Sequence, residues 1–231
     1  MGIWIIMGFF MILSLIASSM LKSRFKEYSR IPTRNGMSGA EVAQKMLFDY
    51  GCYDVRVTSV QGKLTDHYNP ATKTVNLSPD VYNGRNVAAA AVAAHEVGHA
   101  VQHAESYAWL KLRTALVPIQ NVSATILNII FIGMFFGSFL LGGLLPLQTA
   151  LVIIVASYAV FTLFAFVTLP VEFDASNRAL VWLNSAGVTT QQSLGKAKSA
   201  LGWAASTYLI AAISSLATLL YYVALLAGNR D

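Results

Sequence analysis

Residues 118–169 read PIQNVSATILNIIFIGMFFGSFLLGGLLPLQTALVIIVASYAVFTLFAFVTL and contain no charged side chain. Residues 118–141 and 147–169 are each long enough to cross the ~30 Å hydrocarbon core of a bilayer as a helix. Between them, GGLLP at 142–146 combines residues that break helices. The stretch predicts a transmembrane hairpin with its tip at 142–146, because a chain inside the bilayer must satisfy its backbone hydrogen bonds internally.

Two further apolar segments flank this hairpin. Residues 3–21 are uncharged and residues 204–227 form the last long apolar run. With 55% hydrophobic and 12% charged residues and a mean hydropathy of +0.55, the composition excludes an ordinary water-soluble globule. A cleaved signal peptide is the alternative for residues 3–21, but the basic region that precedes such a signal is missing. We therefore expect four transmembrane helices, the first an uncleaved anchor.

The positive charge is concentrated on one side of this arrangement. Twelve of the 16 Lys and Arg residues lie between Lys22 and Arg113, and three more are Arg178, Lys196 and Lys198. Cationic loops stay in the cytoplasm, so this pattern predicts a multi-pass protein of the cell membrane (inner or plasma membrane) whose polar part faces the cytoplasm. The lipid bilayer is then a partner, and nucleic acid is not, because no basic-aromatic surface pattern accompanies the charge. The single cysteine, Cys52, excludes an intrachain disulfide.

The long polar stretch before residue 118 carries the signals of a small α+β domain. Ser38 to Glu41 form a capping box that opens an amphipathic helix, and Gly51 is placed to close it. Residues 54–60 alternate like a strand, and residues 64–69 and 73–78 suit a hairpin. A second helix is expected to begin near Val81 or Asn86 and to continue into residues 95–99.

Residues 95–99 read HEVGH. On a helix, His95 and His99 share one face and can both bind one Zn²⁺. Glu96 lies beside that metal and can take the proton from a zinc-bound water that attacks a peptide carbonyl. A shuffled sequence of this composition would contain HExxH on the order of 0.001 times, so chance is a poor explanation. The structural alternative is a pair of hydrogen-bonded core histidines.

A catalytic zinc needs a third protein ligand. His103 continues the helical series, but its Cα would lie about 12 Å from that of His95, so it is expected beside the metal or on the surface. The two crossings after His99 return the chain to the same side, where Glu172 and Asp174 follow the apolar run. Either carboxylate could complete the site, or both could simply balance the dipole of a solvated helix start.

The motif HEVGHAVQ, preceded by VAAA and followed by LPVEFDAS, resembles the membrane-bound neutral zinc metallopeptidases of bacteria, the YugP-like family. The resemblance covers nearly the whole chain and includes DHYNP at 66–70 and LSPDVYNG at 77–84. Residues 172–176 are also similar to the ExxxD helix of HtpX-type gluzincins, which implies Glu172 as the third zinc ligand. Ser176 stands where those relatives have Asp, so Asp174 becomes a candidate for orienting a ligand imidazole.

Gluzincins hold an extended peptide substrate on an edge strand beside the metal, and residues 64–69 or 73–78 resemble such an edge. His67 could then donate a hydrogen bond to the tetrahedral oxyanion, or it could be an ordinary exposed hairpin histidine.

The sequence therefore predicts a mainly α membrane protein with about four transmembrane helices and a small α+β gluzincin-like catalytic domain at the membrane face. The expected activity is a zinc metalloendopeptidase with one Zn²⁺ per chain, acting on a peptide or membrane-protein substrate; no oligomeric state is indicated. The expected parts are an anchor (1–21), a catalytic domain with the HExxH helix (22–117), a hairpin (118–169), a helix with the third ligand (170–203) and a last transmembrane helix (204–227).

Two alternatives stay open. In a site-2-type intramembrane protease the HExxH helix would itself lie within the bilayer, but the apolar run 87–94 is too short to span it and no Leu-Asp-Gly motif is present. A non-catalytic metal-binding or transport protein would be expected to carry charged residues inside its spans, and residues 118–169 have none.

Overall fold

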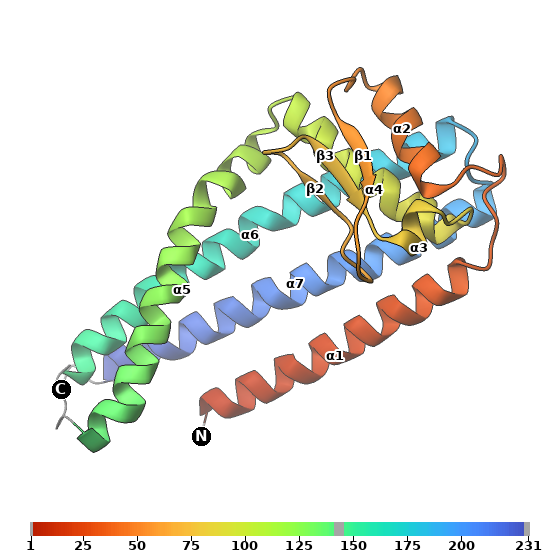
Figure 1. The fold of residues 1–231 in the computed structure, drawn as a ribbon. Helices are drawn as coiled ribbons and strands as arrows, with labels where there is room; N and C mark the ends of the chain where they lie inside the picture. Colours follow the sequence, from red (N-terminus) through yellow and green to blue (C-terminus); the bar gives the residue numbers. More distant parts are fainter. Residues whose placement is uncertain (1, 141–145, 229–231) are drawn as a thin grey trace. The chain divides into compact units, whose positions relative to one another are not determined.

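The computed structural model describes residues 2–140 and 146–228 (Figure 1). Most of the predicted hairpin tip, 142–145, lies outside these residues. The chain forms two compact units, which are described separately. One comprises Met1–Ser14, Leu112–Thr168 and Tyr208–Asp231; the other comprises Leu15–Lys111 and Leu169–Thr207.

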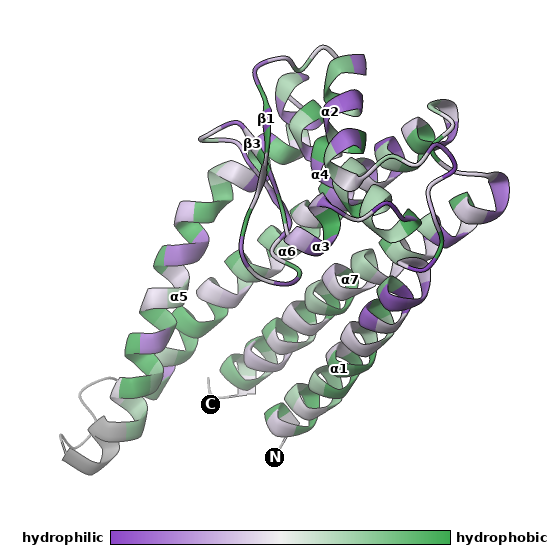
Figure 2. Cartoon of the chain, turned by 45° about the vertical axis from the view of Figure 1, so that its right-hand side comes forward, coloured by the Kyte–Doolittle hydropathy of each residue, from purple (hydrophilic) through white to green (hydrophobic). Residues whose placement is uncertain are grey.

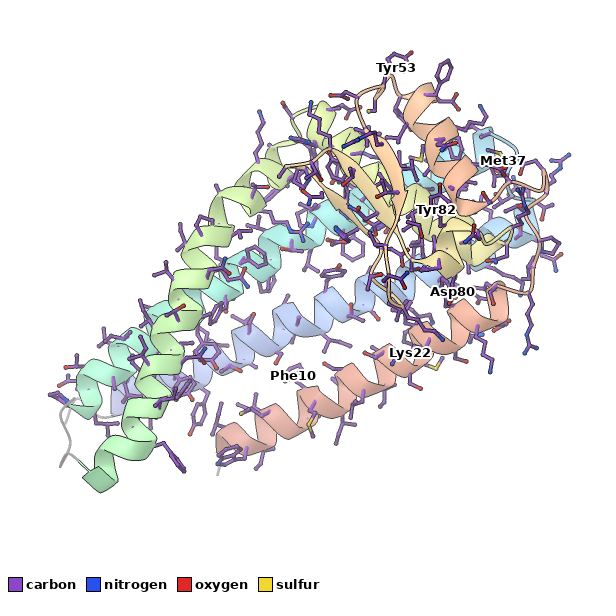
Figure 3. The ribbon with its side chains drawn as sticks, in the orientation of Figure 1. Phe10, Lys22, Met37, Tyr53, Asp80 and Tyr82 are labelled. Carbon is purple, nitrogen blue, oxygen red and sulfur yellow. The ribbon has the colours of Figure 1, made fainter. Side chains whose placement is uncertain are left out.

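Four helices in the described residues are long and apolar enough to cross a membrane, as predicted. They are α1 (Gly2–Tyr28), α5 (Ala108–Leu140), α6 (Leu147–Ser185) and α7 (Gln191–Gly228). Apolar residues predominate along them, whereas the strands and loops carry many hydrophilic ones (Figure 2). Along α1, Phe10 lies in the apolar part and Lys22 opens the basic cluster (Figure 3). The prediction of a mainly α membrane protein with a small α+β part is confirmed.

Each of these helices is longer than the apolar run that predicts it, and α6 is an example. We expected a new helix to begin at residue 170, yet α6 continues through Pro170 to Ser185. Proline removes one backbone donor and strains one turn, but the hydrogen bonds on both sides can keep a long helix continuous. Glu172 therefore lies on an extension of the third apolar helix.

In the unit built from the apolar segments, α5 and α6 bury a small cluster of Leu127, Ile130, Ala150 and Ile154. Tyr158 on α6 stacks on Tyr222 of α7 with ring centroids 5.4 Å apart. Many other large apolar side chains of these helices are exposed, which suits contact with lipid.

The second unit contains the remaining elements: α2 (Gly39–Asp49), β1 (Arg56–Ser59), β2 (His67–Asn69), β3 (Thr74–Leu77), α3 (Pro79–Tyr82) and α4 (Val87–Ala104). The capping box at the start of α2 is present, with Ser38 and Glu41 each bonding the other's backbone. Asn86 caps α4 by accepting from the Ala89 amide. Figure 3 marks Asp80 and Tyr82 on α3, the short helix between β3 and α4.

The sheet has the strand order β1-β3-β2, with β1 parallel and β2 antiparallel to β3. The prediction that residues 73–78 could form the edge strand is therefore wrong, because β3 pairs with a strand on both sides. Residues 64–69 contain β2, which is an edge. β2 and β3 form an antiparallel hairpin, and β3 is the strand of this hairpin that pairs with β1.

Helix α4 is the centre of this unit. Its alanines pack with residues of α2, the sheet, α6 and α7 in one buried cluster. A Cβ on Gly98 would lie only 2.7 Å from the Ala175 carbonyl oxygen, so the absence of a side chain at Gly98 lets α4 and α6 approach closely. This crossing brings residues of α6 beside the HExxH motif.

Candidate metal centre

Three potential metal ligands converge between α4 and α6. The ligand atoms of His95, His99 and Glu172 all lie within 4.8 Å of one another. Glu172 Oε2 is 3.3 Å from His95 Nε2 and 3.6 Å from His99 Nε2. Donors bound at ~2.0–2.1 Å to a tetrahedral zinc lie about 3.3 Å apart. The spacing and the chemistry of these donors therefore fit a zinc ion.

The electrostatics of this cluster favour a cation. The side chain of Glu172 is buried, with 2% of the residue exposed, and a buried carboxylate needs a positive partner. Burial disfavours the charged imidazole of His99, yet the Glu172 carboxylate 3.6 Å from its Nε2 and the charge of Glu96 raise its pKa overall. The site therefore attracts positive charge, either a proton or a metal ion.

The histidines present Nε2 to this centre because their Nδ1 atoms have other partners. Ser176 Oγ lies 3.1 Å from His95 Nδ1. Gln102 Oε1 lies 3.0 Å from His99 Nδ1. A hydrogen bond at one ring nitrogen orients the ring and leaves the other nitrogen for the metal.

Glu96 is close to the cluster but is not one of its three ligand residues. Its Oε2 accepts a hydrogen bond of 3.0 Å from the backbone amide of Tyr68 on β2. The edge strand therefore holds one oxygen of Glu96 in place beside the cluster.

The polar residues around the ligands differ in part from the expectation. Ser176 itself contacts His95, so no carboxylate is needed there. In the described part of the chain, no hydrogen bond joins Asp174 to an imidazole; its Oδ2 accepts from Gln102 Nε2 at 2.8 Å. Sequence reasoning missed Gln102, although a polar residue three positions after His99 on an apolar helix face was a usable signal.

His67 and His103 lie outside the ligand group. The Nδ1–H of His67 donates to the Thr65 carbonyl at 2.8 Å, and its Nε2 lies 3.3 Å from the Asn76 amide nitrogen. This geometry favours an ordinary hairpin histidine over an oxyanion donor. His103 is exposed and its Nδ1 lies 2.8 Å from the Tyr68 hydroxyl, so it bridges α4 to β2 at the surface.

Residues 3–227 match the family model described as "Putative neutral zinc metallopeptidase". The chain is also 43% identical over 220 residues to the "Putative membrane protease YugP" of Bacillus subtilis strain 168, covering 95% of this chain and 94% of that protein. No solved structure matches the chain.

Proposed function

Because the chain belongs to the neutral zinc metallopeptidase family, we propose that it is an integral-membrane zinc endopeptidase that hydrolyses peptide bonds near the membrane. The observation that carries this proposal is the convergence of His95, His99 and Glu172 with Glu96 beside them. Three protein ligands leave a fourth position open, as in catalytic zinc sites.

In this proposal, His95, His99 and Glu172 hold one zinc ion. When bound, zinc acts as a Lewis acid that lowers the pKa of water and polarises the scissile carbonyl. Glu96 accepts the proton of the attacking water and passes it to the departing amine. The Tyr68 amide keeps the Glu96 carboxylate in place during both transfers.

The substrate is proposed to be an extended peptide that lies along the β2 edge. Edge strands recognise peptides through main-chain hydrogen bonds, and β2 is both an edge and the strand that contacts Glu96. A peptide on this edge would have its backbone next to the general base. The bilayer and a peptide or membrane protein are the partners that this arrangement requires.

The active site is proposed to face the cytoplasm. Fifteen of the 16 cationic residues flank the site segments, as the positive-inside rule expects for cytoplasmic loops. Helix α4 is not among the four candidate spans in the described residues, which disfavours a site-2-type intramembrane site. Reporter fusions at Asn35 and Gly187 test the orientation: both should report a cytoplasmic position, and a periplasmic signal from either would rule it out.

The activity is tested with three Glu→Gln variants in purified, zinc-loaded protein. Glu96→Gln should retain zinc and lose cleavage of casein by about 10²–10⁴-fold, because it removes the general base. Glu172→Gln should lose zinc. Glu27→Gln is the matched control, since Glu27 pairs with Arg24 on α1 and should keep both properties. Undiminished cleavage by Glu96→Gln would refute the proposed mechanism.

A further inference from the structure

A buried glutamine connects the metal centre to a polar chain on α6. Gln102 lies on α4 with none of its surface exposed. Its Nε2 donates to the Val171 carbonyl and to Asp174 Oδ2, both at 2.8 Å, while its Oε1 lies 3.0 Å from His99 Nδ1. All the side-chain polar atoms of Gln102 therefore have partners.

These partners determine which way the Gln102 amide points. The Val171 carbonyl and the Asp174 carboxylate can only accept hydrogen bonds, so the NH₂ group must face them. If the Gln102 amide were flipped, its oxygen would face both acceptors, and its buried NH₂ group would lose the hydrogen bonds that it donates to them. The Gln102 oxygen is consequently fixed toward His99.

That orientation in turn selects the tautomer of His99. An amide oxygen only accepts, so His99 Nδ1 must carry a proton, and in the neutral ring Nε2 is then the nitrogen with the lone pair that can bind metal. Ser176 cannot impose the same choice on His95, because a hydroxyl either donates or accepts. The two histidines are therefore held by unequal partners.

Asp174 is itself held in place. Arg178 Nε donates to Asp174 Oδ2 at 2.6 Å, and Arg178 Nη1 pairs with Glu105 Oε2 at 2.7 Å. The side chains of Asp174 and Arg178 are 27% and 20% exposed, so the pair is only partly screened by solvent. The chain of contacts runs from the buried imidazole to the partly exposed Glu105.

We propose that Asp174 and Gln102 are positioning residues that act in series: Asp174 sets the orientation of the Gln102 amide, and Gln102 fixes His99 in the tautomer that binds metal through Nε2. The inference rests on the proposed function, in that it assigns these residues to the zinc site. It differs from the usual carboxylate–histidine contact because an amide lies between the carboxylate and the ring.

The direct test reads the tautomer in metal-free protein at a pH at which the His99 ring is neutral. Protein labelled with ¹⁵N-histidine has only four histidines, so each ring can be assigned by NMR. Wild-type His99 should carry its proton on Nδ1. In Gln102→Met, a replacement of similar size, His99 should shift toward the Nε2–H form. Ser176→Ala is the matched control, since it should disturb His95 and leave the His99 tautomer unchanged.

The second readout is zinc affinity, measured by competition with a chelator. Gln102→Met should weaken zinc binding by about 10–100-fold, the usual effect of losing a partner of a ligand histidine. Asp174→Ala should weaken it less. Because Asp174 acts through Gln102, adding Asp174→Ala to Gln102→Met should cause no further loss.

The outcomes are distinct. A folded Gln102→Met protein that keeps the Nδ1–H form of His99 and binds zinc within twofold of wild type overturns the proposal, and so do additive losses in the double variant. If Gln102→Met does not fold, Asp174→Ala decides: a mixed His99 tautomer with weaker zinc binding supports the series, and wild-type behaviour overturns it. Neither readout uses turnover, so a failure of the proposed peptidase activity would appear separately, in Glu96→Gln.

Discussion

Replacing Gly98 with alanine should loosen the metal centre without touching any ligand. The new Cβ would lie 2.7 Å from the Ala175 oxygen, 3.0 Å from its Cα and 3.1 Å from its carbonyl carbon, where ordinary contacts begin at 3.4 Å. All three atoms are backbone, so no side chain can rotate away. Helices α4 and α6 would have to separate locally by about 0.7 Å, because both carry the clash in their main chains.

This separation matters because the ligands are divided between the same two helices. Metal–ligand distances tolerate about ±0.2 Å, so a shift of this size should pull Glu172 out of reach of a zinc held by His95 and His99. Overpacking costs about 1–3 kcal/mol, against which alanine gains about 0.8–1.0 kcal/mol of helix propensity over glycine. If the same 1–3 kcal/mol opposes zinc binding, the affinity falls about 5- to 150-fold.

The matched control is Gly195→Ala on α7, where a new Cβ meets nothing within 4 Å. It gains the same propensity without the clash, so the difference between the variants isolates the helix contact. Thermal unfolding in detergent should place Gly195→Ala at or above wild type and Gly98→Ala below Gly195→Ala, and chelator competition should show weaker zinc binding only for Gly98→Ala. Equal unfolding temperatures and equal zinc affinities would refute the argument that this crossing sets the site.

Three further outcomes are expected. Burial raises the pKa of Tyr68 to about 12 from an ordinary 10. Its neutral phenol therefore contributes stability that is present below pH 10 and is lost as the pH rises from 10 to 12. In this pH range, chemical denaturation should show a steeper loss of stability for wild type than for Tyr68→Phe, and parallel curves would contradict this. Trp182→Phe removes the 2.9 Å hydrogen bond to Asp49 and should lower the unfolding free energy by about 1–2 kcal/mol, whereas an unchanged melting temperature would show that water replaces the bond. Zinc removal by a chelator should lower the melting temperature and zinc addition should restore it, because a ligand that binds only the folded state stabilises that state. A melting temperature that does not change with zinc would argue against a resident ion.

Most of the site was predictable because its first half is local. His95, Glu96 and His99 lie within one turn of one helix, and the period of that helix places them on adjacent faces whatever surrounds it. The capping box at Ser38 and Glu41 was predictable for the same reason. The four apolar segments were equally clear, since crossing a bilayer depends on length and composition.

Non-local contacts were harder to predict. The likeness to gluzincins implied Glu172, and the structure places it beside both histidines. Gln102 follows His99 at helical spacing, but this signal was missed, and the sequence left open whether residues 64–69 or 73–78 would form the edge. Pro170 suggested a boundary that the continuous α6 does not have, because a proline's local cost can be outweighed by the rest of a long helix.

The sequence by itself therefore determined the membrane class, the HExxH helix and the chemistry that its three polar residues can perform. Only the tertiary structure decided how that helix meets α6. The crossing at Gly98 and Ala175 sets the distance from Glu172 to the imidazoles and brings Gln102 to Asp174. The physical reason is that helical periodicity acts over one turn of a single chain segment, whereas the distance between two helices depends on the side chains that both bury between them.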